Sequence, residues 1–201
     1  MNKESLFKIT YGLYVLTARD NNFDNGCIIN TVMQVTESPL RIVIAVSKEN
    51  KTHDMIMNTG IFNITSLSEK AEFSIFEHFG MNSGNNIDKF KDYESAKRSN
   101  NGLYYIFKMS NMFLSCMVFD KIDLGTHTMF IADVVDGEVI SQDSSCTYDY
   151  YHKNIKPKPR TSNNKSWVCE ICGYVYEGDE LPDDYICPLC KHGADAFKLC
   201  D

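Results

Sequence analysis

Cys169-Glu-Ile-Cys172 and Cys187-Pro188-Leu189-Cys190 are two Cys-x-x-Cys pairs, and 14 residues separate them. Each pair places two thiolates on one tight turn, and two facing turns form a tetrahedral four-sulfur site. Such a site suits Zn²⁺ or a single iron, and the spacing alone does not separate these metals. The 35 residues from 167 to 201 cannot bury a sufficient core by themselves. The sequence therefore predicts a small module over residues 167–201 whose fold depends on a metal.

Charge divides the 201 residues into three parts. Residues 1–151 carry a formal charge of −6, residues 152–166 carry +5, and residues 167–201 carry −6. We interpret these parts as a domain, an extended mobile linker and an acidic module. The net charge of −7 argues against a nucleic-acid partner. The sequence contains neither a signal peptide nor an apolar run of about 18 residues, which predicts a cytoplasmic protein without a membrane partner. In that reducing compartment, paired cysteines favour a metal over disulfides.

The first 151 residues alternate short apolar runs with turn signals, which predicts a mainly β fold of the barrel type with a few short helices. Strands are expected at 13–19, 27–33, 41–47, 62–67, 113–119 and 127–135, and helices at 5–10, 52–58 and 69–79. The turn cluster from Asp20 to Gly26, which ends in Asn25-Gly26, predicts a hairpin turn, and Thr52 is the predicted N-cap of its helix. Five methionines are predicted to fill the core: Met33, Met55, Met57, Met109 and Met112.

Two polar segments carry candidate chemistry. One is Asn30 to Pro39, where the chain leaves a strand, and the other is Ser47 to Asp54, which opens a helix. A helix start with a hydroxyl and a lysine favours phosphate, although an ordinary N-cap with a surface His53 gives the same pattern. Lys89 is interpreted as a solvated surface lysine. The isolated Cys27, Cys116 and Cys146 are interpreted as small buried residues rather than nucleophiles.

The C-terminal segment resembles rubredoxin. The matching stretches are 167–176, 181–190 and 194–197, which include all four paired cysteines. The resemblance implies that Cys169, Cys172, Cys187 and Cys190 hold one iron that carries single electrons. It also implies an aromatic cage of Trp167, Tyr174, Tyr176, Tyr185 and Phe197. The short spacing between the pairs is that of rubredoxin modules fused to larger redox proteins, and Lys191 replaces the family's glycine. A structural zinc knuckle is the alternative.

The N-terminal domain resembles the flavin reductase-like family of FMN-binding split-barrel proteins. The resemblance rests on Asn30-Thr31, Gln34-Val35-Thr36, Pro39, residues 47–53, His78-Phe79-Gly80, Ser83-Gly84 and Asp88-Lys89-Phe90. It implies a homodimer with FMN near the interface. Asn30 and Thr31 would lie along the flavin and its ribityl–phosphate tail. Gln34, Val35 and Thr36 would line the isoalloxazine, and Phe79, Gly80 and Ser83 would lie close to it. Ser47, Lys51, Thr52 and His53 would bind the phosphate.

Together the two parts resemble the high-molecular-weight rubredoxins. The resemblance implies that electrons pass from NAD(P)H through FMN to an Fe(Cys)₄ centre, and on to a redox partner such as a flavodiiron protein. No side chain need act as a general acid or base, because the cofactors carry the chemistry. No Gly-x-Gly-x-x-Gly motif is present, so NAD(P)H would bind without a Rossmann fold. The alternatives are a flavin or ferric reductase with a diffusible acceptor, and a non-enzymatic flavin-binding domain with a structural zinc knuckle.

Overall fold

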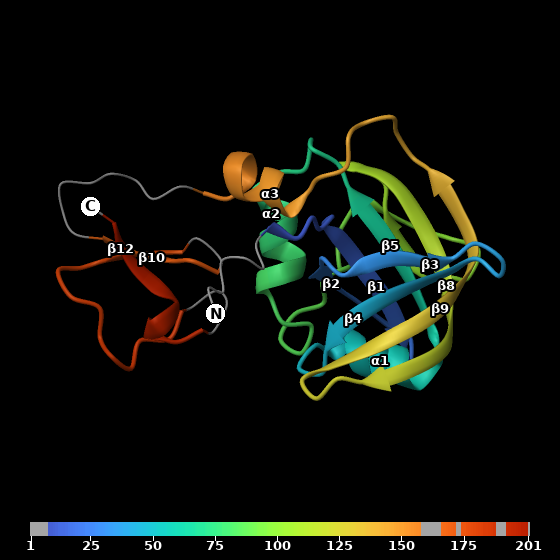
Figure 1. The fold of residues 1–201 in the computed structure, drawn as a ribbon, viewed down its shortest axis with the longest axis horizontal. Helices are drawn as coiled ribbons and strands as arrows, with labels where there is room; N and C mark the ends of the chain where they lie inside the picture. The colour runs from blue at the N-terminus through green and yellow to red at the C-terminus, as the bar shows by residue number, and fades with distance from the viewer. Residues whose placement is uncertain (1–7, 158–165, 172–173, 188–191, 201) are drawn as a thin grey trace. The chain divides into compact units, whose positions relative to one another are not determined.

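The computed structural model describes residues 8–157, 166–171, 174–187 and 192–200 (Figure 1). The chain divides into two compact units, Met1–His152 and Lys153–Asp201. The predicted linker begins differently from our expectation of an extended chain, because η3 (Tyr151–Ile155) is a short π-helix. Tyr151 is buried there and packs on Phe76, with ring centroids 4.5 Å apart. Residues 158–165 of the predicted linker lie outside the described residues.

The N-terminal unit is built on one seven-stranded antiparallel sheet with the order β2-β1-β5-β8-β9-β4-β3. Its strands are β1 (Tyr14–Asp20), β2 (Phe23–Ile29), β3 (Val32–Thr36), β4 (Arg41–Ser47), β5 (Ile61–Leu67), β8 (Ser110–Asp123) and β9 (His127–Val139). The sheet curls into a barrel, and its two edge strands, β2 and β3, follow one another in the chain (Figure 1). β6 (Ala96–Arg98) and β7 (Tyr104–Ile106) form a separate two-stranded antiparallel sheet. The predicted mainly β barrel is confirmed.

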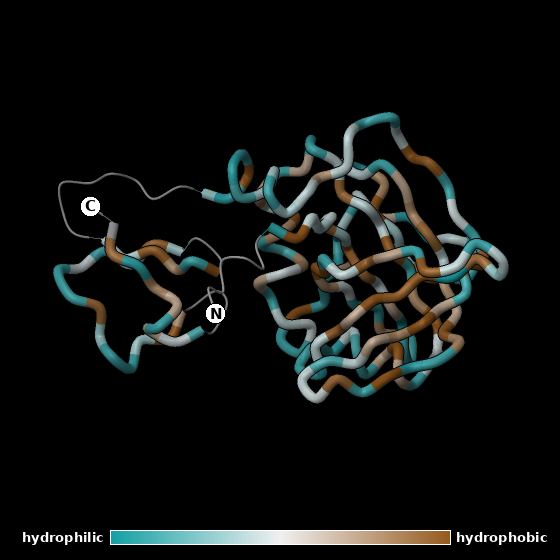
Figure 2. Tube along the Cα trace, viewed as in Figure 1, coloured by the Kyte–Doolittle hydropathy of each residue, from teal (hydrophilic) through white to brown (hydrophobic). Residues whose placement is uncertain are grey.

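The core of this unit follows from strand periodicity. In β4 every second residue is buried, which places Ile42, Ile44 and Val46 inside the barrel. Phe62 and Phe130 pack with them in the same cluster. Figure 2 shows the hydrophobic stretches concentrated along the barrel strands and the hydrophilic ones along the connecting loops. α1 (Lys51–Thr59) contributes the buried Met55 and Ile56 to this core.

The first hairpin turn lies inside the predicted turn cluster 20–26, at Asn21-Asn22, four residues before the Asn25-Gly26 pair. Asp20 pairs with Phe23, and Asn21 and Asn22 between them have φ values of 48° and 64°. Asparagine tolerates this left-handed conformation, and two such residues form the tight turn that suits a twisted hairpin. Gly26 instead lies inside β2, where an added Cβ would come within 3.1 Å of Phe79. The glycine therefore permits a close approach rather than a turn.

The helices also differ from the sequence-based expectations. α1 begins at Lys51 with Asn50 as its N-cap, so the assignment of Thr52 as the cap was wrong. The helix expected at 69–79 is shorter: α2 (Phe73–Phe76) continues as a π-helical turn, η2 (Glu77–Met81). α3 (Tyr148–Tyr150) leads into η3. Half of the expected helix at 5–10, residues 5–7, falls outside the described residues. Within the described part of the chain, no helix has the length and apolarity to cross a membrane.

The methionines are divided between core and surface. Met55 is 4% exposed, as predicted, whereas Met33 and Met57 are 61% and 40% exposed. Met33 lies on the edge strand β3, whose residues from 33 to 36 are all exposed. The prediction that these two residues fill the core is wrong, because methionine's apolar character does not determine which face of an element it occupies.

The C-terminal unit contains a three-stranded antiparallel sheet with the order β11-β10-β12. Its elements are β10 (Ser166–Cys169), β11 (Val175–Glu177), the short 3₁₀ helix η4 (Ala194–Ala196) and β12 (Phe197–Cys200). Val168 pairs with Val175 on one side and with Lys198 on the other, so the central strand ends at the first cysteine of the predicted metal site.

Candidate functional site

A pocket of about 360 Å³ opens between residues 9–12 and strands β3 and β4. Two predicted FMN residues, Asn30 and Thr31, line it together with apolar side chains that include Met33, Ile44 and Met129. Its size and largely apolar lining are those of a small-molecule site, and they fit a planar aromatic ring. The Thr31 hydroxyl donates to the carbonyl of Ala45 at 2.9 Å and accepts from its amide at 3.1 Å. It therefore fixes one wall of the pocket by joining the start of β3 to β4.

The three residues predicted to line the isoalloxazine are not part of this pocket's lining. Gln34, Val35 and Thr36 continue along the edge strand β3 and are exposed in this single chain. The Thr36 hydroxyl donates to the Pro39 carbonyl, and the Gln34 amide donates to the Thr36 carbonyl at 3.4 Å. Their predicted contact with the flavin stays a prediction.

The predicted phosphate residues gather at the first turn of α1. The Lys51 ammonium donates to the carbonyl of Gly84 at 3.0 Å and lies 3.8 Å from the centroid of the Phe23 ring. The buried Thr52 hydroxyl accepts from the Asn25 amide at 3.0 Å. The same Asn25 amide packs against Gly84, where an added Cβ would fall 2.2 Å from Asn25 Oδ1. These contacts bring the Ser83–Gly84 loop beside Lys51 and Thr52, although more than 30 residues separate them in sequence.

His53 is buried rather than exposed, with 6% of its surface accessible. Its Nε2 is hydrogen-bonded to the Thr128 hydroxyl at 2.9 Å, and its Nδ1 to Asp54 at 2.8 Å. The surface alternative for His53 is therefore wrong. Its ring, like the Thr52 hydroxyl, is used inside the domain, which leaves Ser47 and Lys51 as the half-exposed members of the predicted phosphate set.

Phe79, Gly80 and Ser83 lie on η2 and the loop after it. Phe79 is 1% exposed and packs against Phe90 and Tyr93, whereas Gly80 and Ser83 are exposed. The structure thus brings the loop of Gly80 and Ser83 to the start of α1, and it places Asn30 and Thr31 at the pocket.

β4 joins these two places. Ala45 lines the pocket, and Ser47, which ends the strand, is two residues further along, or about 7 Å. The arrangement can accept an elongated ligand with an aromatic ring at one end and an anionic group at the other.

Lys89 was missed by the sequence reasoning. It is 2% exposed, and its ammonium donates to the carbonyls of Gly26 at 2.8 Å and Phe79 at 3.0 Å. Burial lowers the pKa of Lys89 to about 8, opposed by the neighbouring Cys27. The interpretation as a solvated lysine is wrong, because carbonyls 63 and 10 residues away in the sequence hold the side chain inside the domain.

The isolated cysteines are buried, as predicted. Burial raises the pKa of Cys116 to about 12, and burial followed by the charge of Glu69 raises that of Cys146 to about 11. Burial also raises the pKa of Cys27, against a hydrogen bond from Thr52 and the charge of Lys89. All three thiols are therefore protonated at neutral pH, which is not the state of a nucleophile.

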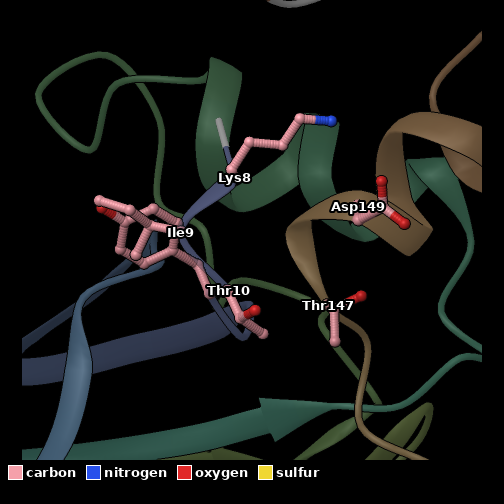
Figure 3. A pocket seen from close by; sticks show the side chains of 6 residues that line it. Lys8, Ile9, Thr10, Thr147 and Asp149 are labelled. Carbon is pink, nitrogen blue, oxygen red and sulfur yellow. The ribbon is translucent and has the colours of Figure 1, made fainter. Parts of the chain in front are cut away.

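A second pocket, of about 330 Å³, lies where residue 8 enters the domain. Figure 3 shows Lys8, Ile9 and Thr10 on one side of it and Thr147 and Asp149 on the other. The Thr147 hydroxyl caps the short α3 by accepting from the Tyr150 amide at 3.1 Å. None of the predicted site residues lines this pocket.

The metal centre is described in part. Cys169 and Cys187 are fully buried, whereas Cys172 and Cys190 lie outside the described residues. The amide of Cys169 donates to the Tyr174 carbonyl at 2.9 Å, and that of Cys187 to the His192 carbonyl at 2.8 Å. Each bond joins a described cysteine to a residue that follows the second cysteine of its pair in the sequence. Among the described residues alone, no three potential ligands come together. Two buried thiols, each belonging to a Cys-x-x-Cys pair, fit a thiophilic metal.

Three of the five predicted cage aromatics are in contact around Tyr185. Its ring centroid lies 4.7 Å from that of Tyr176 and 5.3 Å from that of Phe197. Desolvation, followed by a hydrogen bond to Tyr174, raises the pKa of Tyr185. These rings supply the unit's small apolar core beside the two described cysteines.

The fold and the paired cysteines define the class: a flavin reductase-type β-barrel joined to a small cysteine-rich metal module. Residues 6–158 match the flavin reductase like domain, and residues 167–198 match the rubrerythrin, rubredoxin-like domain. The chain therefore belongs to the flavin reductase-like family and carries a C-terminal rubredoxin-like domain. This combination defines a flavin-linked electron-transfer oxidoreductase.

Similar proteins agree with this assignment. The high molecular weight rubredoxin of Moorella thermoacetica is 33% identical, over 98% of this chain and 99% of its own length. The NAD(P)H ferric-chelate reductase of Archaeoglobus fulgidus is also 33% identical, over 81% of this chain and 96% of its own. An NADH:FAD oxidoreductase of Streptomyces globisporus shares the fold, with a TM-score of 0.63 at 19% identity over 71% of this chain and 84% of its own. The resemblance to high-molecular-weight rubredoxins is confirmed.

Proposed function

We propose that this protein takes electrons from NAD(P)H onto FMN in its N-terminal unit and passes them through an Fe(Cys)₄ centre to a protein acceptor. The observation that carries the proposal is the union, in one chain, of a flavin reductase-like domain and two Cys-x-x-Cys pairs. FMN accepts electrons in pairs and releases them singly, whereas a four-thiolate iron carries one at a time. The full-length similarity to a high molecular weight rubredoxin supports the same order of centres.

The residues of the N-terminal unit fit FMN. The apolar pocket beside Asn30 and Thr31 would hold the ring and exclude water from it. At the other end, Lys51 and the first turn of the nine-residue α1 would hold the phosphate, since both favour an anion. The chain's own residues orient the cofactor, and none is required to exchange a proton.

The C-terminal unit would deliver the electrons. Cys169, Cys172, Cys187 and Cys190 would hold the iron. Seven exposed acidic residues surround the unit: Glu170, Glu177, Asp179, Glu180, Asp183, Asp184 and Asp195. Their negative field would steer the unit towards a basic patch on its acceptor. A flavodiiron protein is the acceptor we propose, and relatives named putative diflavin flavoproteins contain a domain similar to this one.

A homodimer is also part of the proposal. Large apolar side chains are exposed on β3, β8 and β9, among them Met33, Val35, Met117, Phe119 and Val135. A monomer rarely exposes so many on neighbouring strands, and a second copy would cover them. Sedimentation of the full chain tests this: a dimer is expected, and a monomer at micromolar concentration would contradict it.

An anaerobic absorption spectrum of freshly purified protein, followed during stepwise addition of NADH and then NADPH, tests the relay. We expect flavin bands together with a red ferric-thiolate absorption, both of which bleach on addition of the nucleotide. Zinc in the metal analysis, in protein expressed with ample iron, would refute the iron centre and leave a structural knuckle. Protein that takes up no FMN would refute the assignment of the N-terminal unit.

A flavin or ferric reductase with a diffusible acceptor is the second candidate. It is favoured by the ferric-chelate reductase of Archaeoglobus fulgidus, which matches this chain over 96% of its own length. A full-length Cys169→Ser, Cys187→Ser variant separates the two. If electrons leave through the metal, the variant keeps NAD(P)H-dependent FMN reduction but loses reduction of the protein acceptor. If both activities survive, the metal is not the conduit.

A further inference from the structure

Lys89 is buried in a place where its charge has no carboxylate partner among the contacts described. Its ammonium instead donates to two main-chain carbonyls, Gly26 on β2 and Phe79 on η2. Burying an ammonium is unfavourable unless its protons are hydrogen-bonded, so a lysine at this position indicates a specific task for its donors. Lys91, two residues further on, is exposed like an ordinary surface lysine.

Other contacts at the same point show what the lysine joins. The Lys89 carbonyl accepts a hydrogen bond from Nε2 of His78 at 2.7 Å, and Phe90 packs on Phe79 with ring centroids 5.5 Å apart. Gly26 allows β2 to approach Phe79, because any Cβ there would lie within 3.1 Å of the Phe79 ring and of the Leu16 carbonyl. Residues 78–79 and 89–90 are therefore joined by three contacts, which are the bond from the Lys89 ammonium, the bond from His78 and the packed rings, and the segment between them forms a closed loop.

That loop carries Gly80, Ser83 and Gly84. Lys51 holds its far side through the Gly84 carbonyl, at the start of α1. Lys89 holds its base to β2. The loop is therefore held at two places. Lys51 bonds it to the helix that would bind the phosphate, and Lys89 bonds its base to strand β2 of the barrel.

We propose that Lys89 is a positioning residue, which fixes the loop of residues 80–88 against β2 so that the loop is already in place when FMN binds. The part concerning FMN rests on the proposed function, whereas the tie between β2 and η2 does not. Lys89 touches neither the pocket lining nor the exposed residues of the loop, so it acts through Phe79 and Gly26.

The test compares full-length Lys89→Met, which keeps the length of the side chain but removes its donors, with Lys91→Met as the matched control. Amide hydrogen exchange of the FMN-free proteins measures the tie directly. We expect Lys89→Met to speed exchange at least about tenfold in residues 77–90 and to leave the β4, β8 and β9 amides unchanged. FMN titration should then show a dissociation constant raised by about tenfold, with Lys91→Met within twofold of the unchanged protein.

Exchange in residues 77–90 that matches the Lys91→Met control would overturn the proposal. So would faster exchange throughout the sheet, since it would make Lys89 a general stability element. If Lys89→Met does not fold, Lys89→Gln replaces it: its amide keeps donors but is too short to reach both carbonyls, so the same local increase is expected. If the unchanged protein binds no FMN, the proposed function fails while the exchange result still decides the tie.

Discussion

Replacing Thr52 by valine separates two roles for a residue at the start of α1. The family resemblance makes its hydroxyl a phosphate ligand, whereas the structure uses it inside the domain. The hydroxyl accepts from the Asn25 amide at 3.0 Å, and Thr52 and Asn25 are 0% and 2% exposed. It also hydrogen-bonds the Cys27 thiol. Valine has the same shape but no acceptor, so the variant leaves a buried N–H of Asn25 without its partner.

The expected loss follows from that unpaired donor. An unsatisfied buried polar group costs about 1–3 kcal/mol, which lowers the folding equilibrium constant by about 5- to 150-fold. The Asn25 Oδ1 atom is already buried without a described partner, so the amide has no second hydrogen bond to compensate. Thr52→Ser keeps the hydroxyl and should lose only the contacts of a methyl group, about 1 kcal/mol.

Urea unfolding of the full chain measures the loss. The single tryptophan, Trp167, belongs to the C-terminal unit, so far-UV circular dichroism is needed to follow the seven-stranded sheet. We expect Thr52→Val to lower the free energy of unfolding by 1–3 kcal/mol and to change FMN affinity less than threefold. An unchanged free energy of unfolding together with a loss of FMN affinity above tenfold would refute the reasoning and make Thr52 a ligand.

Three further predictions concern other parts of the chain. Gly84→Ala places a Cβ 2.2 Å from Asn25 Oδ1, so it should move the loop of Gly84 away from α1 and weaken FMN binding. Gly102→Ala, on a surface turn, is the control and should change stability alone. Equal FMN affinities of the two variants would contradict this prediction. Cys169→Ser should abolish metal binding, by metal analysis, and unfold the C-terminal unit while the N-terminal sheet keeps its unfolding transition. Burial raises the pKa of the Cys116 thiol from 9.0 to about 12, so the protonated thiol stabilises the fold fully below pH 9, and this contribution is lost as the pH rises to 12. Between pH 9 and pH 12 the free energy of unfolding should therefore fall by up to about 4 kcal/mol less in Cys116→Ala than in the unchanged protein, as measured by urea unfolding.

The strands were the most predictable part of this protein. β4 has the predicted bounds, 41–47, because its alternating burial is written directly in Arg-Ile-Val-Ile-Ala-Val-Ser. The first hairpin turn lies within the predicted cluster 20–26, but at Asn21-Asn22, because the glycine of Asn25-Gly26 serves a contact with Phe79. Local patterns therefore located the elements, and close approaches between elements decided what individual turn-like residues do.

The candidate site was less predictable, because several side chains that match the family's ligand-binding pattern form hydrogen bonds inside the domain instead. Thr52 and His53 match the family pattern, yet the structure turns both inwards, towards Asn25 and Thr128. Lys89 follows an exposed aspartate and resembles a surface residue in sequence, and only the carbonyls of Gly26 and Phe79 explain its burial. No local pattern predicts these acceptors, which lie 63 and 10 residues from Lys89 in the sequence. Asp88-Lys89-Phe90 is part of the family resemblance, which assigns no role to Lys89.

The segment between η3 and β10 sets a geometric limit on the proposed relay. η3 ends at Ile155 and β10 begins at Ser166, so ten residues join them instead of the fifteen of the predicted linker. Ten residues span at most about 35 Å when fully extended, compared with about 50 Å for fifteen. The metal unit can therefore serve only a flavin within the combined reach of this segment and of the unit itself, either its own flavin or that of a second copy. Mixed dimers that combine an FMN-binding chain lacking the metal with a metal-bearing chain lacking FMN would show which one it uses: acceptor reduction in the mixture requires transfer between copies, and its absence confines transfer to one chain.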